Sequence, residues 1–173
     1  MMSRFLNPES RENQMDPVLA ELFESGADDR LAGELFSRIL AAHGNEVDAA
    51  KLNEEEQVVY LVIGAHGVIG NGGFRYLFEH IINGDPYFAL TLRAFEVIGC
   101  WEAAEAVRTT LAKFLNSKPP TNLEKRMRLY NRRIEEFPTP EDRQFFAAMD
   151  EIERRLADFV RARQWAFNHL RPA

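Results

Sequence analysis

The sequence has a single cysteine, Cys100, among its 173 residues. One thiol cannot form an intrachain disulfide, so a disulfide-stapled secreted fold is excluded. Long hydrophobic runs are lacking as well: the longest, Val58–Phe74, is too short to cross a bilayer and contains His66 and Asn71. The first residues, Met1–Glu9, lack the apolar core of a signal peptide. We therefore expect a soluble cytoplasmic protein that has no membrane partner.

Patterns that bind metals or cofactors are also missing. None of the four histidines has a glutamate three residues before it, and the sequence contains neither His-Glu-x-x-His nor paired cysteines. No Gly-x-Ser-x-Gly elbow occurs, and the glycine-rich stretch 64–73 lacks the Lys-Ser/Thr of a phosphate-binding loop. We expect no metal and no cofactor. Whether the protein is an enzyme stays open, although the sequence leans toward a protein without catalytic activity.

A surplus of positive charge is absent too, because the net charge is −6. Direct nucleic-acid binding usually needs a basic surplus, so we do not expect it. The negative charge belongs to residues 1–56, which carry 13 acidic and 5 basic residues. A solvated helical surface explains such a bias, and an acidic docking face is the alternative. The candidate acidic interaction face consists of Asp16, Glu21, Glu24, Asp28, Asp29, Glu34, Glu46, Asp48, Glu54, Glu55 and Glu56.

What the sequence does contain is apolar residues at helical spacing, with a hydrophobic content of 46%. This pattern predicts an all-α single domain of seven or eight helices, with an acidic helical segment at 1–52 and a core at 53–168. Asp16-Pro17 and Asn53 are typical helix starts. The expected helices are 17–25, 28–43, 54–69, 74–82, 86–98, 101–114, 123–134 and a long C-terminal helix from Thr139 to about Asn168.

The helix from Glu54 to Ile69 is apolar on more than one face, so we expect it to be central and buried. Its glycines at 64, 67 and 70 recur every three residues. Each costs the helix about 1 kcal/mol relative to alanine, which predicts close approach of another helix or side chain. Asn71, Gly72, Gly73 and Phe74 then form a sharp corner. A structural turn in which Asn71 bonds the freed amides is favoured, and binding of an anion or ligand is the alternative.

Three further features each have a structural and a functional interpretation. His66 is expected to be a hydrogen-bonded core histidine rather than a ligand, and Cys100 a small buried hydrophobe rather than a reactive thiolate. Lys125, Arg126, Arg128, Arg132 and Arg133 are expected to form local ion pairs on a solvated helix rather than a nucleic-acid patch. In the C-terminal helix, a seam of residues at heptad-like spacing predicts packing within the domain, with a dimer seam as the alternative.

The corner also carries a resemblance. Asn71–Phe78 resembles the Asn-Gly-Gly-Phe motif of the DNA-mimic protein C-terminal-like family, long catalogued as a domain of unknown function. Ala94–Cys100 is similar to its second motif, and Phe145-Phe146, Asp150 and Phe159-Val160 complete the pattern over about 53–168. Tyr76 stands where this family commonly has a glutamine.

The resemblance implies an all-helical fold and a named member that is an acidic, dimeric DNA mimic bound to the DNA-binding surface of a transcription factor. We therefore predict a non-enzymatic, acidic protein-interaction module whose partner is a basic DNA-binding protein. A homodimer is a second partner to consider. The alternative is a small-ligand binder or enzyme that uses the glycine-rich corner Gly70–Phe74, with His66 or His80 and Tyr76 nearby.

Overall fold

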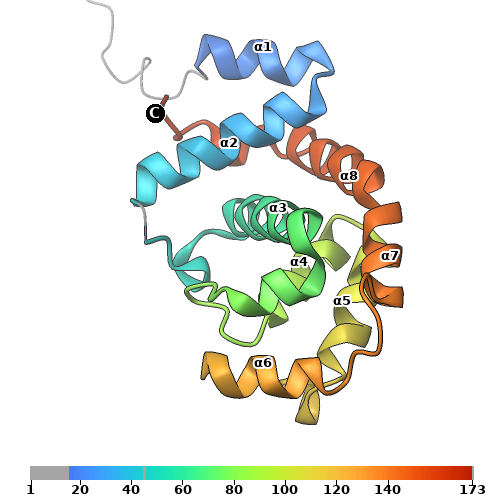
Figure 1. Ribbon diagram of the computed structural model, residues 1–173. Helices are drawn as coiled ribbons and strands as arrows, with labels where there is room; N and C mark the ends of the chain where they lie inside the picture. Colours follow the sequence, from blue (N-terminus) through green and yellow to red (C-terminus); the bar gives the residue numbers. More distant parts are fainter. Residues whose placement is uncertain (1–15, 45, 173) are drawn as a thin grey trace, which may run out of the picture.

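The computed structural model describes residues 16–44 and 46–172 (Figure 1). The N-terminal residues considered above for a signal peptide lie outside this range. Eight α-helices and no strand occur in these two segments, which confirms the all-α prediction. The helices are α1 (Pro17–Ser25), α2 (Asp28–His43), α3 (Glu54–Glu79), α4 (Ala89–Val97), α5 (Trp101–Leu111), α6 (Leu123–Asn131), α7 (Pro140–Ala147) and α8 (Met149–Arg161).

Helix α3 lies at the centre and contacts α2, α4, α6, α7 and α8. In Figure 1 it is seen nearly end-on, between α2 and α8 on one side and α4 and α6 on the other. Its apolar residues face several of these neighbours at once: Val58, Val59, Leu61 and Val62 are all buried. This agrees with the expectation of a central helix, because a helix that is apolar around its circumference needs cover on every side.

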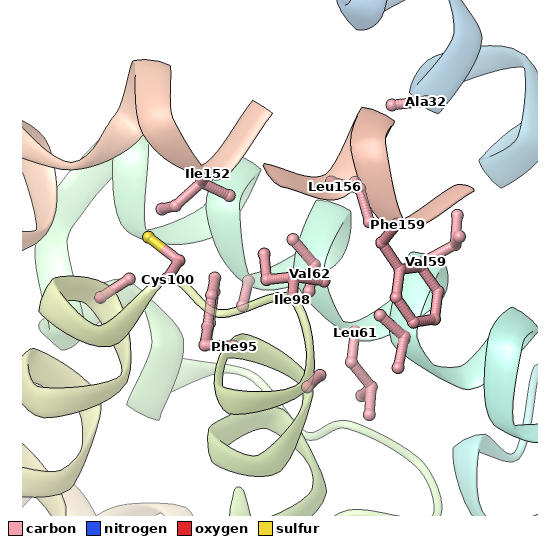
Figure 2. Close-up of a cluster of buried hydrophobic side chains, with 14 of the residues drawn as sticks. Ala32, Val59, Leu61, Val62, Phe95, Ile98, Cys100, Ile152, Leu156 and Phe159 are labelled. Atoms are coloured by element: carbon pink, nitrogen blue, oxygen red, sulfur yellow. The ribbon is translucent and has the colours of Figure 1, made fainter. Parts of the chain in front are cut away.

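Helices α2 and α8 pack on each other and on α3 to close the upper part of the core. Figure 2 shows Ile152 and Leu156 extending from α8 toward Val62, with Ala32 of α2 close to Leu156. A single hydrophobic cluster runs through the molecule and includes residues as far apart in the chain as Leu19 and Leu170.

Two predicted helix starts are confirmed by their hydrogen bonds. The Asp16 carboxylate accepts the backbone N–H groups of Val18 at 3.0 Å and Leu19 at 3.2 Å. The Asn53 side chain accepts the N–H of Glu56 at 2.8 Å. Both caps satisfy donors that have no partner in the first turn of a helix, so α1 and α3 begin where the sequence predicts.

Several predicted helix boundaries are wrong. The helices expected to end at 82, 114 and 134 end at Glu79, Leu111 and Asn131. Helix α4 begins at Ala89 and not at Pro86, because the Asp85 carboxylate accepts the N–H groups of Leu90 (3.1 Å) and Thr91 (2.8 Å). The predicted C-terminal helix is two helices, α7 and α8, separated at Ala148, where φ and ψ are −93° and −2°. The apolar seam of that region nevertheless faces the interior of the domain: Phe145, Ile152, Leu156 and Phe159 are buried, and Met149 is partly buried.

The glycines of α3 correct another expectation. A Cβ atom at Gly70 would lie 2.9 Å from Cε of Met149, as close approach predicts. At Gly64 and Gly67, however, a Cβ would meet nothing within 4 Å. These two glycines therefore cost helix stability without admitting a neighbour.

The prediction that Arg126 is one of several solvated cations on α6 is wrong, because this side chain is buried. Its guanidinium donates to the carbonyl oxygens of Phe78 (2.6 Å) and His80 (3.2 Å) at the end of α3. It also donates to those of Pro120 (2.9 Å) and Thr121 (3.2 Å) in the loop before α6. This one side chain holds α6 and its loop against the C-terminus of α3, where carbonyl groups lack helical partners.

Candidate functional site

The glycine corner is a kink inside α3. Gly72 has φ −163° and ψ 22°, and Gly73 has φ 68° and ψ −168°, so two helical halves meet here at a change of direction. The left-handed φ of Gly73 strains any residue with a Cβ. A Cβ at Gly73 would also lie 2.5 Å from Oδ1 of Asp142, and one at Gly72 would collide with the Tyr76 ring. The corner is therefore filled by protein side chains.

Asp142 supplies the polar contacts of this corner. Its Oδ1 accepts the backbone N–H of Phe74 at 2.7 Å, and its Oδ2 accepts the N–H of Thr139 at 2.8 Å. The Thr139 hydroxyl in turn accepts the N–H of Asp142 at 3.1 Å. Asp142 thus caps both α7 and the second half of α3. Sequence reasoning missed this role, although threonine followed three residues later by an acid is a capping-box signal.

Asn71 does not have the expected role. Its side-chain Nδ2 donates to the carbonyl oxygen of Gly67 at 2.7 Å, on the exposed side of α3. The prediction that Asn71 bonds the amides freed by the corner is wrong, because Asp142 binds the amide of Phe74 from across the fold.

The motif aromatics meet in the core. The ring of Phe74 lies 5.7 Å from that of Phe145, and Phe95 lies 5.5 Å from Phe145, both edge to face. These residues come from the three motif segments identified in the sequence, and all three are fully buried. Edge-to-face pairs of this kind stabilise a core beyond the area that they bury. The motif therefore encodes packing, and residues 70–74 do not line any of five cavities seen in the described part of the chain.

The candidate acidic interaction face is partly neutralised by the protein's own cations. Arg38 binds both Asp16 (2.9 Å) and Glu34 (2.7 Å). The remaining ion pairs of this set are Asp28 with Arg161 (2.7 Å), Asp48 with Lys51 (3.1 Å) and Glu54 with Arg93 (3.6 Å). The hydrogen bond from Arg38 lowers the pKa of Asp16, so this carboxylate stays ionised within its pair.

Glu56 lies inside the molecule and is 1% exposed. Its two carboxylate oxygens face Nε2 of His43 at 3.1 Å and Nε2 of His169 at 2.7 Å. These contacts join the end of α2, the start of α3 and the C-terminal segment. The Glu56 carboxylate therefore links parts of the fold and is not available to a partner at the surface.

Five carboxylates of the face have no cationic partner among the described residues: Glu21, Glu24, Asp29, Glu46 and Glu55. Glu21 and Glu24 are exposed and share one face of α1, and Asp29 is exposed in the first turn of α2. Glu46 and Glu55 lie beyond the other end of α2. The tertiary structure thus reduces eleven candidates to five, of which three sit at the α1–α2 junction.

The DMP19-like protein family matches residues 50–163. The chain belongs to this family. The match covers the helices from α3 to α8 and includes the motif segments that meet at Phe145, in agreement with the resemblance to a DNA-mimic family. No curated protein and no solved structure matches the chain significantly.

The family match leaves α1 and α2 of this DMP19-like protein outside its bounds. These are the helices that carry Glu21, Glu24 and Asp29. None of the helices in the described part of the chain is long and apolar enough to cross a membrane.

Helix α6 of the DMP19-like protein and the two residues that follow it present unpaired cations. Lys125, Arg128, Arg132 and Arg133 are exposed and have no carboxylate within 4.0 Å in the region that the structure describes. The expectation of local ion pairs on this helix is wrong. Glu124 and Glu135 are close in sequence, but their carboxylates do not reach these cations.

Cys100 is fully buried, as expected for a small hydrophobe. Burial raises the pKa of its thiol, which disfavours the reactive thiolate. Its sulfur lies within 4.8 Å of oxygens of Glu102 and Glu151, a grouping that could in principle hold a metal ion. Arg155, however, donates to Glu151 at 3.0 Å, and a protonated thiol is a poor ligand, so the local chemistry opposes metal binding.

His66 is half-buried between α3 and α8 and is not the hydrogen-bonded histidine that the sequence predicts. Its Nε2 is inaccessible to water and has no hydrogen-bond partner, and the nearest carboxylate oxygen, Oε1 of Glu153, is 3.8 Å away. Burial lowers the pKa of the imidazole, and the Glu153 charge offsets only part of this effect. His80 differs, because its Nδ1 lies 2.6 Å from the carbonyl oxygen of Tyr76 at the end of α3.

Proposed function

We propose that this DMP19-like protein is a non-enzymatic interaction module that binds a basic DNA-binding protein in place of DNA. The carboxylates that would contact the partner are Glu21, Glu24 and Asp29. A second copy of the chain remains the alternative partner.

The observation that carries this proposal is the pairing state of the acidic residues. A carboxylate that already faces an arginine of its own chain gains little from a partner's cation, because the attraction is largely satisfied. Glu21, Glu24 and Asp29 are exposed and unpaired among the described residues, so their negative charge is available to attract and orient a positively charged surface. Membership of the DMP19-like family supports a protein partner in general terms.

The rival proposal, a ligand site at Gly70–Phe74, has weaker support. The positions that a ligand would need at Gly70, Gly72 and Gly73 are filled by Met149, Tyr76 and Asp142. The amide of Phe74, which could have bound an anion, already donates to Asp142.

The test is a charge reversal. The tagged protein and the triple variant Glu21→Lys, Glu24→Lys, Asp29→Lys are used to capture proteins from host lysate, and the captured proteins are identified by mass spectrometry. Duplex DNA is then added as a competitor. The proposal expects enrichment of a DNA-binding protein that duplex DNA displaces and that the triple variant no longer captures.

A matched control changes net charge by the same amount elsewhere. Glu102, Glu124 and Glu135 are exposed and have no cationic partner among the described residues, so Glu102→Lys, Glu124→Lys, Glu135→Lys is the appropriate variant. Capture should persist in this control. If both triple variants lost capture equally, the effect would be explained by net charge alone, and the proposal would be overturned. Failure to capture any DNA-binding protein would overturn it as well.

A further inference from the structure

A small cavity lies beside Asp29, between α2, α3 and α8. It has a volume of about 130 Å³ and an apolar floor formed by Val62, Ile152 and Leu156. Figure 2 shows Ile152 and Leu156 pointing from α8 toward α3, with Ala32 of α2 nearby. The space is well below the 300–1,000 Å³ of pockets for cofactors or drug-sized ligands, and is of the size of one side chain.

Polar groups stand only at the rim of this cavity. Asp29 is exposed and has no cationic partner in the described segments, and Glu153 has a side chain that is 47% exposed. His66 also lines the cavity, but its Nε2 is inaccessible to water and is therefore not presented to an incoming group. The imidazole is neutral near pH 7 because burial lowers its pKa, so the ring does not repel a cation in the cavity.

We infer that this cavity receives an arginine side chain of the basic protein partner, an inference that rests on the proposed function. The aliphatic stem of arginine would cover the floor at Val62 and Leu156. The planar guanidinium carries five N–H donors, which suits the two carboxylates better than the compact ammonium of lysine. A desolvated pocket filled by an arginine is also a common centre of binding energy at protein interfaces.

Other occupants fit the cavity less well. A trapped water needs two to four polar partners, and the floor of this cavity at Val62, Ile152 and Leu156 offers none from its side chains. A purely apolar side chain would fill the floor but would desolvate the two carboxylates without pairing them. Arginine supplies both the apolar stem and the donors.

The structure provides a clean way to close the cavity. Gly33 lines it and is exposed, and a Cβ atom added there would meet nothing within 4 Å, so Gly33→Leu is chosen to place a larger side chain at the opening. Gly67 on α3 is equally open and does not line this cavity, so Gly67→Leu is the matched control. Both replacements raise helix propensity, so neither is expected to unfold the protein.

The experiment is an NMR titration of the full chain with the blocked peptide acetyl-Gly-Arg-Gly-amide. Peptides with citrulline or norleucine in place of arginine serve as comparisons. We expect saturable shifts at Gly33 and His66 with the arginine peptide, and binding weaker by about tenfold or more in Gly33→Leu but unchanged in Gly67→Leu. The neutral citrulline peptide should bind more weakly than arginine, and the double variant Asp29→Asn, Glu153→Gln should remove that preference.

Absence of saturable shifts at Gly33 and His66 would overturn the inference, and so would equal binding by Gly33→Leu or equal affinity for the citrulline or norleucine peptide. These outcomes are separable from failure of the proposed function. One outcome is that the Glu21/Glu24/Asp29 triple variant loses partner capture while the peptide does not bind. The acidic docking surface would then be supported and the arginine pocket would not. Peptide binding without capture of any DNA-binding protein would mean that the pocket exists and that the partner is of another class.

Discussion

At the scale of single residues, the carboxylate of Asp142 joins two helices that are distant in sequence. It is fully buried and accepts N–H groups from Phe74 and Thr139. A buried N–H that loses its acceptor costs about 1–3 kcal/mol. The corner formed by the motif glycines therefore depends on Asp142, which lies 68 residues after Phe74 in the sequence.

We predict that Asp142→Ala lowers the free energy of unfolding by about 2–4 kcal/mol, because two buried N–H groups lose their acceptor. Urea denaturation followed by circular dichroism measures this change. Asp150→Ala is the control, since Asp150 is exposed and unpaired among the described residues, and it should shift the free energy by no more than about 0.5 kcal/mol. Equal effects of the two variants would show that the Asp142 contacts contribute nothing specific.

His66 gives a prediction about pH. Its pKa is lowered in the folded protein, so the unfolded chain binds the proton more tightly near pH 6. The contribution of this histidine to stability is therefore fully present above the ordinary histidine pKa of about 6.5, and is lost as the pH falls below it.

The measurement is the urea midpoint between pH 8 and pH 5 for the wild type and for His66→Gln, which does not titrate in this range. The wild type should lose more stability on acidification than the variant does. Parallel pH profiles would contradict the burial of a neutral imidazole at this position.

At the scale of elements, the kink divides α3 into two helical halves. Gly73 has a left-handed φ and faces Asp142 at a distance that leaves no room for a Cβ, whereas Gly67 is an ordinary, open helical glycine. The two positions lie in the same helix and should respond to the same substitution with opposite signs.

We predict that Gly73→Ala destabilises the protein by about 2 kcal/mol or more, from backbone strain and the contact with Asp142. Gly67→Ala should instead stabilise it by about 0.5–1 kcal/mol, because alanine loses less backbone entropy in a helix. Thermal denaturation of the two variants and the wild type measures both stability changes. A stabilising Gly73→Ala would mean that the corner is not held in this conformation.

The elements also show how far sequence patterns reach. Asp16 and Asn53 predict helix starts correctly, since a cap involves neighbours within three residues. The apolar spacing of the C-terminal seam predicts which side is buried. It does not predict the break between α7 and α8, because the spacing continues across Ala148 although the helix does not. The burial of Arg126 escapes prediction for a related reason: its carbonyl partners at the end of α3 are far away in sequence.

At the scale of the whole molecule, α1 and α2 lie outside the family match yet share its core. Leu31, Leu35 and Ile39 of α2 are fully buried in the same cluster as Leu156 of α8. Removal of these helices would expose the apolar surface of α3 and α8 that they cover. The division of one domain into an acidic segment at 1–52 and a core at 53–168 stays a prediction.

We predict that a fragment of residues 46–172 loses its cooperative unfolding transition. It should keep helical far-ultraviolet circular dichroism but lose the near-ultraviolet signal of packed aromatics, and it should bind a hydrophobic dye. The full chain is the reference. A sharp thermal transition of the isolated fragment would show instead that residues 16–44 form an accessory segment on an independent domain.

By itself the sequence determined that this protein is helical, where most helices begin, and that Asn71–Phe74 marks a turn, because these features depend on caps, apolar spacing and glycine within a few residues. The tertiary structure alone decided which acidic groups stay free, since Asp28 is neutralised by Arg161 from the other end of the chain and Glu56 is enclosed by two histidines. It also decided that Asp29, His66 and Glu153 share one cavity. Charge is a property of composition, but its availability to a partner depends on which side chains the packing of distant helices brings together.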